Sequence, residues 1–479
     1  MFTPFQNFSL QERKYAVFSM LFLLCTSGLI GQEFANELQI PPLIPSTVTN
    51  YHLNVIETEH DFSPQGSDSL HNVMIRTFAF EDADNPGGNT ILGPSISWQL
   101  GNMVSPRVTN MLDERTTCHW HGAHVPQYAD GGPHQIIQAG DTWNPSFEIM
   151  DKSATMWYHP HAMGLTYEHV QLGLSGMIYV EDPVGVDPIL ESIHSFMPTD
   201  YGVDDFPLIF QTKKFRRDST GNIEIQAVDG YKNDYTYLVN GRVDPYLEIP
   251  DAMVRLRILN GDGKFAFMLG LNNAEGTAPE DLELVATDAG YTTRSWSMPQ
   301  ILMSPGERTE WLLDARGRAG DTLYIYYKDS DIPDGVSGNA STTQNYAVDR
   351  PLLRLVIVDN PSIPPSPIIA FPIPLFPSER PSMSLVTNTR HKVFRKDSFL
   401  IDGEWENLFN IDSTLMDMTV VNDVVKLDST EIWTIENRTP IAHPWHIHDI
   451  HFWVTEIIQN STGQALNPAA YPELFDGPK

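Results

Sequence analysis

The chain of 479 residues, 41% of them hydrophobic and 10% aromatic, is too long for one domain and fits about two to four. Its 61 acidic residues outnumber its 30 lysines and arginines. The resulting net charge of −31 argues against nucleic-acid binding, because phosphate contacts need clustered basic side chains. The 32 glycines and 36 prolines favour a turn-rich, all-β architecture.

The N-terminus has the features of a secretory signal. Arg13 and Lys14 precede a mostly apolar stretch over residues 16–30, and small residues follow it. We therefore expect a signal peptide over residues 1–31, which places the mature protein in the periplasm or outside the cell. An uncleaved membrane anchor is the alternative, but the apolar stretch is short for a transmembrane helix. No other segment could span a bilayer, so we expect no stable membrane insertion once the signal is removed.

A first β domain is predicted over residues 45–183, where short segments are bounded by glycine, proline, asparagine and aspartate. It contains two His-x-His pairs, His119-Trp120-His121 and His159-Pro160-His161. In an extended strand, side chains at positions i and i+2 point to the same face, so each pair forms a two-pronged clamp. The same alternation turns Cys118 to the opposite face, where we expect a buried structural thiol.

A second β domain is predicted over residues 190–359 and has no His-x-His pair, which suggests a structural spacer. We expect its strands near residues 206–215, 235–239, 254–259, 282–287, 311–314 and 323–327. A proline-rich linker over residues 360–384 leads to a third domain over residues 385–479. In the third domain, Leu400-Ile401-Asp402-Gly403 echoes Leu238-Val239-Asn240-Gly241 of the second, which indicates a weak internal repeat.

The third domain contains His443-Pro444-Trp445-His446-Ile447-His448, with three imidazoles in six residues. A single His-x-His pair is more often a surface or packing feature, but three pairs in aromatic and proline-rich contexts favour a shared cluster. Three converging clamps would enclose more than one metal ion. Neutral imidazole suits copper, zinc, iron and nickel, so the ligand type alone leaves the metal open.

These three motifs, in this order, resemble the copper-ligand signature of the multicopper oxidases. The flanking Asp130-Gly131-Gly132-Pro133 and residues 173–182 are also similar to the bacterial branch with the copper-efflux oxidase, the spore-coat laccase and bilirubin oxidase. The resemblance extends from about residue 70 to the end of the chain. It implies an all-β fold of three cupredoxin-like Greek-key β-sandwich domains, the third of them incomplete.

The resemblance also implies roles for individual residues. His119 and His446 would hold a type 2 copper, and His443 would be one ligand of a type 1 copper. The binuclear type 3 copper site would take four ligands from this chain, namely His121, His159, His161 and His448.

Several neighbours of these motifs have roles that the sequence leaves less certain. Asp130 is assigned as a proton relay, with an ordinary turn residue as the alternative reading. His124 and His134 are expected to support the site or to lie on the surface. Three tryptophans are expected to pack around the cluster, namely Trp120, Trp157 and Trp445.

The family's cysteine-containing segment, with the remaining type 1 ligands and two further type 3 histidines, has no counterpart in this sequence. We therefore expect the chain to be a fragment of a longer protein that is inactive without that segment. The alternative is a natural variant that lacks the electron-entry site. The 17 methionines are dispersed along the chain and do not indicate handling of cuprous ions.

The resemblance implies a copper-dependent oxidoreductase whose partners are O2 and a small reducing substrate. It would couple one-electron oxidation of phenols, aromatic amines or low-valent metal ions to four-electron reduction of O2 to water. One alternative is a non-catalytic, exported copper-binding protein without the electron-entry site. A redox-dead structural relative, of the kind found among cell-division proteins, and a zinc hydrolase are weaker alternatives.

Overall fold

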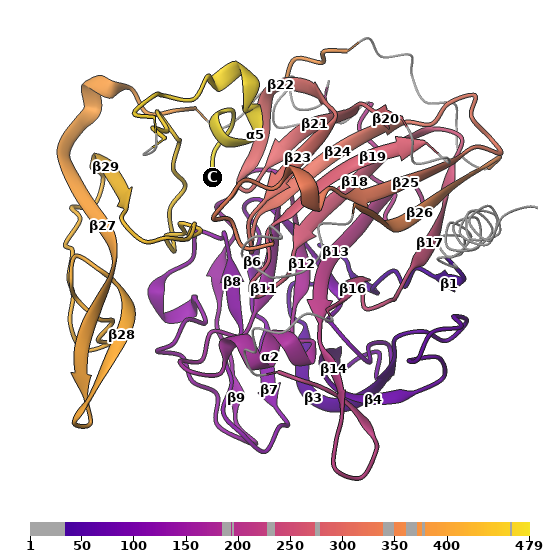
Figure 1. The fold of residues 1–479 in the computed structure, drawn as a ribbon, viewed down its shortest axis with the longest axis horizontal. Coiled ribbons are helices and arrows are strands. Elements are labelled where there is room, and N and C mark those ends of the chain that lie inside the picture. The colour runs from indigo at the N-terminus through magenta and orange to yellow at the C-terminus, as the bar shows by residue number, and fades with distance from the viewer. Residues whose placement is uncertain are drawn as a thin grey trace, which may run out of the picture.

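The computed structural model describes residues 34–183, 193, 196–227, 235–273, 278–338, 349–360, 371–375, 379–459 and 462–479. The predicted signal peptide lies outside these residues, and the predicted linker is described only in part. Strands make up most of the regular structure, as Figure 1 shows, and the all-β prediction is confirmed.

Two sheets form the first sandwich, with strand orders β4-β3-β7-β9 and β2-β5-β12-β11-β8. Alternating apolar residues from both sheets, such as Val55, Phe80, Ile96 and Tyr158, meet in one core. The strands are β2 (Leu43–Ile44), β3 (His52–Asp61), β4 (Met74–Asp82), β5 (Ser95–Gln99), β7 (Arg107–Asn110), β8 (His119–His121), β9 (Thr142–Trp143), β11 (Ala154–His159) and β12 (Gly176–Glu181). A small sheet of β6 (Met103–Val104) and β10 (Phe147–Glu148) and the helix α2 (Thr166–Leu172) complete this part of the chain.

The second sandwich pairs a sheet ordered β1-β17-β26-β25-β19-β20, with β23 beside β19, and a sheet ordered β16-β13-β18-β24-β21-β22. The two sheets share a core that includes Leu256, Phe267, Trp311 and Leu355. The strands are β1 (Asn36–Glu37), β13 (Asp205–Lys213), β16 (Thr236–Val239), β17 (Pro245–Pro250), β18 (Met253–Asn260), β19 (Phe267–Asn273), β20 (Pro279–Glu280), β21 (Leu282–Thr287), β22 (Gly290–Met298), β23 (Gln300–Met303), β24 (Arg308–Asp314), β25 (Thr322–Tyr327) and β26 (Arg350–Val358). A hairpin of β14 (Phe215–Arg217) and β15 (Ile223–Ile225) projects from it.

A buried ionic network joins the two sandwiches. The Arg257 guanidinium lies 2.8 Å from Asp205 and 2.9 Å from Glu181. Thr155 on β11 donates its hydroxyl to Glu310 on β24 at 2.6 Å. Because these charges are buried, each depends on its partner, and the network holds β11 against the second sandwich.

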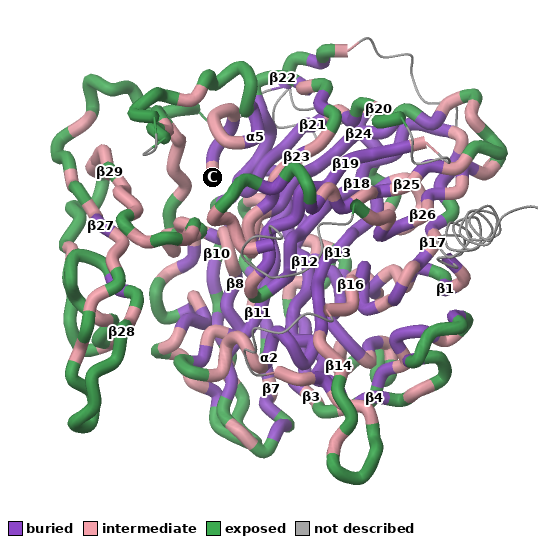
Figure 2. Tube along the Cα trace, viewed as in Figure 1, coloured by how far each residue is buried: buried purple, intermediate pink, exposed green. Residues whose placement is uncertain are grey.

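The third lobe (residues 386–459 and 462–479) has one sheet ordered β28-β27-β29, built from β27 (Val386–Ile401), β28 (Glu404–Ile411) and β29 (Thr430–Asn437). Most of it is exposed, as Figure 2 shows, and large apolar side chains such as Trp405 and Leu427 lie on its surface. The hairpin turn at Asp402-Gly403 has positive φ at both residues, as does the turn at Asn240-Gly241 after β16. The predicted internal repeat thus corresponds to two turns that both need left-handed backbone.

The third lobe lies beside both sandwiches, in orange and yellow in Figure 1. Its last residues anchor it to the second sandwich, where Asp476 accepts hydrogen bonds from Thr293 and from the Trp296 indole at 2.6 Å. The backbones of Phe452 and Lys479 also pair with each other. The predicted domain boundaries remain predictions.

Candidate metal centre

Six of the seven predicted histidine ligands converge where the first sandwich meets the third lobe. On β8 and β11, antiparallel pairing sets His119 directly opposite His159, so the first two clamps are neighbours by register. The ring centroids of His119 and His448 lie 4.1 Å apart, and those of His121 and His446 lie 3.8 Å apart. We call these six side chains the histidine cluster: His119, His121, His159, His161, His446 and His448.

The third pair reaches the cluster from irregular chain rather than from a strand, since residues 441–457 form no strand. The two rings nevertheless lie together, with centroids 5.0 Å apart for His446 and His448. His448 also contacts His161, at 5.1 Å between ring centroids. Tertiary contacts, rather than the alternation of an extended strand, therefore bring the rings of His446 and His448 to the same side.

His443 lies apart from the cluster. Its Nε2 is 2.7 Å from the Thr439 hydroxyl, and its ring stacks on Phe394 at 4.9 Å and meets Phe409 at 5.1 Å. Pro444 and Trp445 separate it from His446, so that neighbouring residues reach different environments. That His443 serves a different metal site stays a prediction.

Burial favours the metal-binding, neutral form of His121, His159 and His161. Burial, followed by the charges of neighbouring rings, lowers the pKa of His121 and His159 well below the ordinary value for histidine. Burial also lowers the pKa of His161, to about 4. Neutral imidazole has a free nitrogen lone pair and is the ligand form of histidine.

His119 provides a direct test of whether the cluster suits a metal ion. Its Nδ1 donates to the Asp130 carbonyl oxygen at 2.8 Å, while its Nε2 is buried with no hydrogen-bond partner in the described part of the chain. A buried polar atom without a partner is costly. A bound metal ion would satisfy it, so the donor set fits a metal centre.

Asp130 lies between imidazoles from the first sandwich and the third lobe. Its Oδ2 accepts from His448 Nδ1 at 2.9 Å, and its Oδ1 lies 3.2 Å from His119 Nδ1. Burial alone would raise the pKa of Asp130, but the contacts with His119 and His448 outweigh it and lower that pKa. Gly131, with φ of 71°, allows this approach, because a Cβ there would lie 1.7 Å from the Cys118 carbonyl oxygen.

Of the three predicted tryptophans, only Trp157 is placed against the cluster, where it stacks on His159 at 4.0 Å. Trp120 packs in the core against Trp98, because strand alternation turns it away from its histidine neighbours. Trp445 packs on aromatic rings of the third lobe. The prediction was wrong for the last two. Cys118 is buried in the same core as Trp120, as expected.

The second sandwich is more than a spacer, because one of its loops contacts the cluster. A Cβ at Gly306 would lie 3.6 Å from the His121 ring. Next to it, the buried Arg308 donates to the carbonyl oxygens of Thr155 and Asp288 and forms an ion pair with the Asp288 carboxylate at 2.8 Å. Its positive charge adds to the lowering of the pKa of His121. No motif in the sequence signals this arginine.

His124 and His134 have different environments. His134 is exposed, whereas the His124 ring contacts the buried carboxylate of Asp151. The third-lobe residue His451 completes this group, with its ring centroid 4.1 Å from that of His124. Sequence reasoning missed Asp151 and His451, because neither belongs to a His-x-His pair.

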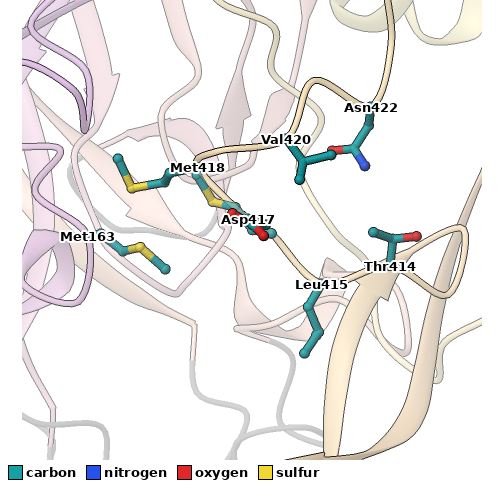
Figure 3. A pocket seen from close by; sticks show the side chains of 8 residues that line it. Met163, Thr414, Leu415, Asp417, Met418, Val420 and Asn422 are labelled. Atoms are coloured by element: carbon teal, nitrogen blue, oxygen red, sulfur yellow. The ribbon is translucent and has the colours of Figure 1, made fainter.

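Three methionines that are dispersed in the sequence line one open pocket of about 540 Å³. Met163 follows His161 in the first sandwich, whereas Met416 and Met418 flank Asp417 in the third lobe. Figure 3 shows the side chains of Met163 and Met418 next to each other. The fold therefore brings together three methionines that are dispersed in the sequence.

Comparison with known proteins gives consistent results. Two family models, each described as multicopper oxidase, match residues 87–185 and 380–473. The multicopper oxidase mco of Staphylococcus haemolyticus is 30% identical over 371 residues, which cover 77% of this chain and 70% of that protein. The cell division protein FtsP of Escherichia coli is 29% identical over 431 residues, covering 89% and 81%.

A solved structure of the laccase-like multi-copper oxidase CueO from Ochrobactrum sp. has a TM-score of 0.72 and 27% identity, covering 92% of this chain and 89% of that one. The McoA multicopper oxidase of Aquifex aeolicus, at 22% identity and a TM-score of 0.71, shows the same fold. Within the described residues, no helix combines the length and apolar character needed to cross a membrane.

Proposed function

Because this chain belongs to the multicopper oxidase family, we propose that it forms the copper centre of an oxidase that reduces O2 to water by four electrons. The electrons would come one at a time from phenols, aromatic amines or low-valent metal ions. The observation that carries the proposal is the convergence of six imidazoles around the buried, unpartnered Nε2 of His119. Copper ions bound there would store the electrons that the reduction of O2 requires.

We propose that His119 and His446 hold a single copper ion and that the other four cluster histidines serve a copper pair. In this division each site would take ligands from both the first sandwich and the third lobe, since the ring centroids of His119 and His446 lie 6.3 Å apart and those of His161 and His448 lie 5.1 Å apart. His443 is proposed as a ligand of a third, outlying site. The family's thiolate for that site is not Cys118, which is buried in the first core.

Around the cluster, side chains of this chain would orient the imidazoles and exclude water. Asp130 accepts a hydrogen bond from Nδ1 of His448 and lies near Nδ1 of His119, which directs the Nε2 atoms of both rings inward. We propose that its carboxylate also relays protons to the site of O2 reduction. Trp157 covers one ring of the cluster and excludes water there.

Of the three substrate classes, the methionine pocket favours low-valent metal ions. Thioether sulfur is a soft ligand that selects cuprous copper. Met163 lies two residues beyond His161, so an ion held there would be close to the cluster. We therefore expect O2 uptake to be faster with cuprous donors than with phenols. Replacing Met163 and Met418 by leucine should lower the cuprous rate and leave the phenol rate unchanged.

The main alternative is an exported copper-binding protein without oxidase activity. The similarity to the cell division protein FtsP, over 81% of that protein, favours keeping this alternative. Export itself remains a prediction from the N-terminal sequence. The two functions differ in one observable property, since only the oxidase needs an outlying copper with a thiolate ligand.

The deciding experiment uses the full-length product of the gene, loaded with copper. The oxidase proposal expects bound copper, a blue absorption from copper–thiolate bonding, and O2 uptake driven by a phenolic or cuprous donor. Copper binding with neither blue absorption nor O2 uptake would contradict the oxidase proposal and support the copper-binding protein.

A further inference from the structure

A second group of metal-binding side chains lies beside the histidine cluster. His124 Nδ1 contacts Asp151 Oδ1, and His451 Nε2 lies 3.5 Å from the same oxygen. The candidate ligand atoms of the three side chains all lie within 4.8 Å of one another. None of the six cluster histidines is among them.

The carboxylate at the centre of this group is buried and fixed in place. The Asp151 side chain is only 2% exposed, and its Oδ2 accepts the backbone N–H of His124 at 3.0 Å. That hydrogen bond orients Oδ1 toward both imidazoles. A carboxylate held in this way is already arranged for a third partner.

The surroundings of the group favour a positive charge. Burial alone would lower the pKa of His124, but the hydrogen bond and charge of Asp151, with the nearby charge of Asp449, raise it. A divalent cation would respond to the same two carboxylates. The His124 side chain is 28% exposed, which gives an ion access from solvent.

We propose that His124, Asp151 and His451 form a second metal site, for a borderline divalent cation of the zinc type, distinct from the copper cluster. Two imidazoles and one carboxylate, with a position left for water, are a common ligand set for Zn²⁺. Calcium and magnesium prefer oxygen ligands and fit this set poorly. His451 Nε2 now donates to the Gly122 carbonyl oxygen at 3.2 Å, so ion binding at that nitrogen would require the ring proton to lie on Nδ1 instead.

An ion at this site would join two parts of the chain. His124 and Asp151 belong to the first sandwich, whereas His451 belongs to the third lobe and follows His448 by three residues. Gly122, the present partner of His451, directly follows His121. The ion would therefore fasten the seam on which the histidine cluster depends, and it should stabilise the fold even when no copper is present.

The test removes the copper cluster first, so that its result does not depend on the proposed oxidase function. In the full chain carrying His159→Ala and His446→Ala, Zn²⁺ alone is added after chelator treatment, and bound zinc is measured by equilibrium dialysis. We expect one equivalent bound and a rise in Tm. X-ray absorption at the zinc edge should show two imidazole ligands.

Adding His124→Ala to this background should remove that equivalent and the rise in Tm, and His451→Ala should do the same. His134→Ala, at an exposed histidine of the same region, is the matched control and should change neither. If the background protein binds no zinc, or if its stoichiometry is the same with His124→Ala, the three side chains are only a hydrogen-bonded clasp and the proposal is wrong. If both alanine variants fail to fold, His124→Gln takes their place in the comparison and should also lose the bound equivalent.

Discussion

Asp130 contacts histidines from distant parts of the chain, His119 and His448, the latter 318 residues away. Its carboxylate accepts from His448 Nδ1 and its carbonyl oxygen accepts from His119 Nδ1, which selects the nitrogen of each ring that faces inward. A short turn, closed by Gly131, places it there. Asp130 can therefore be both a turn residue and a functional residue, because the turn places its carboxylate against His119 and His448.

Substituting Asp130 with asparagine tests the relay. The amide has nearly the same shape but cannot take up a proton, so we expect kcat for O2 reduction in the copper-loaded, full-length protein to fall by about 100-fold. Copper content should fall little, which is checked by metal analysis of the same sample. If turnover per bound copper is unchanged, Asp130 only positions the imidazoles.

His60 offers a pH-dependent prediction away from the copper ligands. It is buried between the Thr90 hydroxyl and the Gly241 carbonyl, and burial, with the charge of Arg242, lowers its pKa to about 3. Between that value and the ordinary 6.5, the unfolded chain binds a proton that the folded chain excludes, so stability falls as pH falls below about 6.5. From pH 6.5 to pH 5 this amounts to at most about 2 kcal/mol.

Urea unfolding at pH 7.5 and pH 5 measures this loss. His60→Gln should show a smaller loss between the two pH values than the unaltered protein, because glutamine does not titrate. The exposed His134→Gln should show the same loss as the unaltered protein. An equal loss in all three proteins would mean that His60 is not the group responsible.

At the scale of elements, the pairing of β8 with β11 determines the geometry of the centre. His119 opposes His159 in the register, so two clamps from separate motifs meet without any loop rearrangement. The reverse face of the same strands carries Trp120 and Tyr158 into the core. The second sandwich supports β11 from outside through the network of Arg257, Asp205 and Glu310.

Arg257→Ala should destabilise this junction strongly. It would leave the buried carboxylate of Asp205 without its main partner, which typically costs about 3–5 kcal/mol. The control is Arg316→Ala, which breaks an ion pair with Asp314 that is partly exposed to solvent. That substitution should cost about 0–1 kcal/mol in the same urea unfolding measurement. Similar losses for the two variants would contradict the role of the buried network.

At the scale of the whole molecule, the centre exists only while the third lobe stays docked. That lobe has few buried side chains of its own, and it bonds to the second sandwich through Ala442, whose N–H donates to the Gly335 carbonyl oxygen, and through its last residues. Asp476 is one anchor among those last residues, since it accepts from Thr293 and Trp296. Docking therefore controls whether His446 and His448 reach their partners.

Asp476→Ala should weaken copper binding without touching any ligand. Loss of the anchor makes the bound arrangement of the third lobe less populated, and apparent affinity falls in proportion to that population. We expect about a tenfold loss, measured by competition with a copper chelator. Asp218→Ala is the control, because Asp218 bonds only within its own exposed turn. No difference between the two variants would show that docking does not depend on Asp476.

The sequence by itself determined the all-β class, the turns that echo each other, and six of the residues that gather in the cluster. These follow from local rules, since strand alternation, turn chemistry and motif composition act over a few residues. Two predictions were wrong because tertiary contacts decided them. They were the strand at residues 446–448 and the packing of Trp120 and Trp445 against the cluster.

Only the tertiary structure decided which imidazole faces which, and it alone placed Arg308, Asp151 and His451 beside the cluster. These contacts join residues that lie far apart in the chain and that share no repeating pattern. The physical reason is that burial and electrostatic pairing depend on distances through space, and a spacing along the chain contains no information about those distances until the sheets and the third lobe are packed.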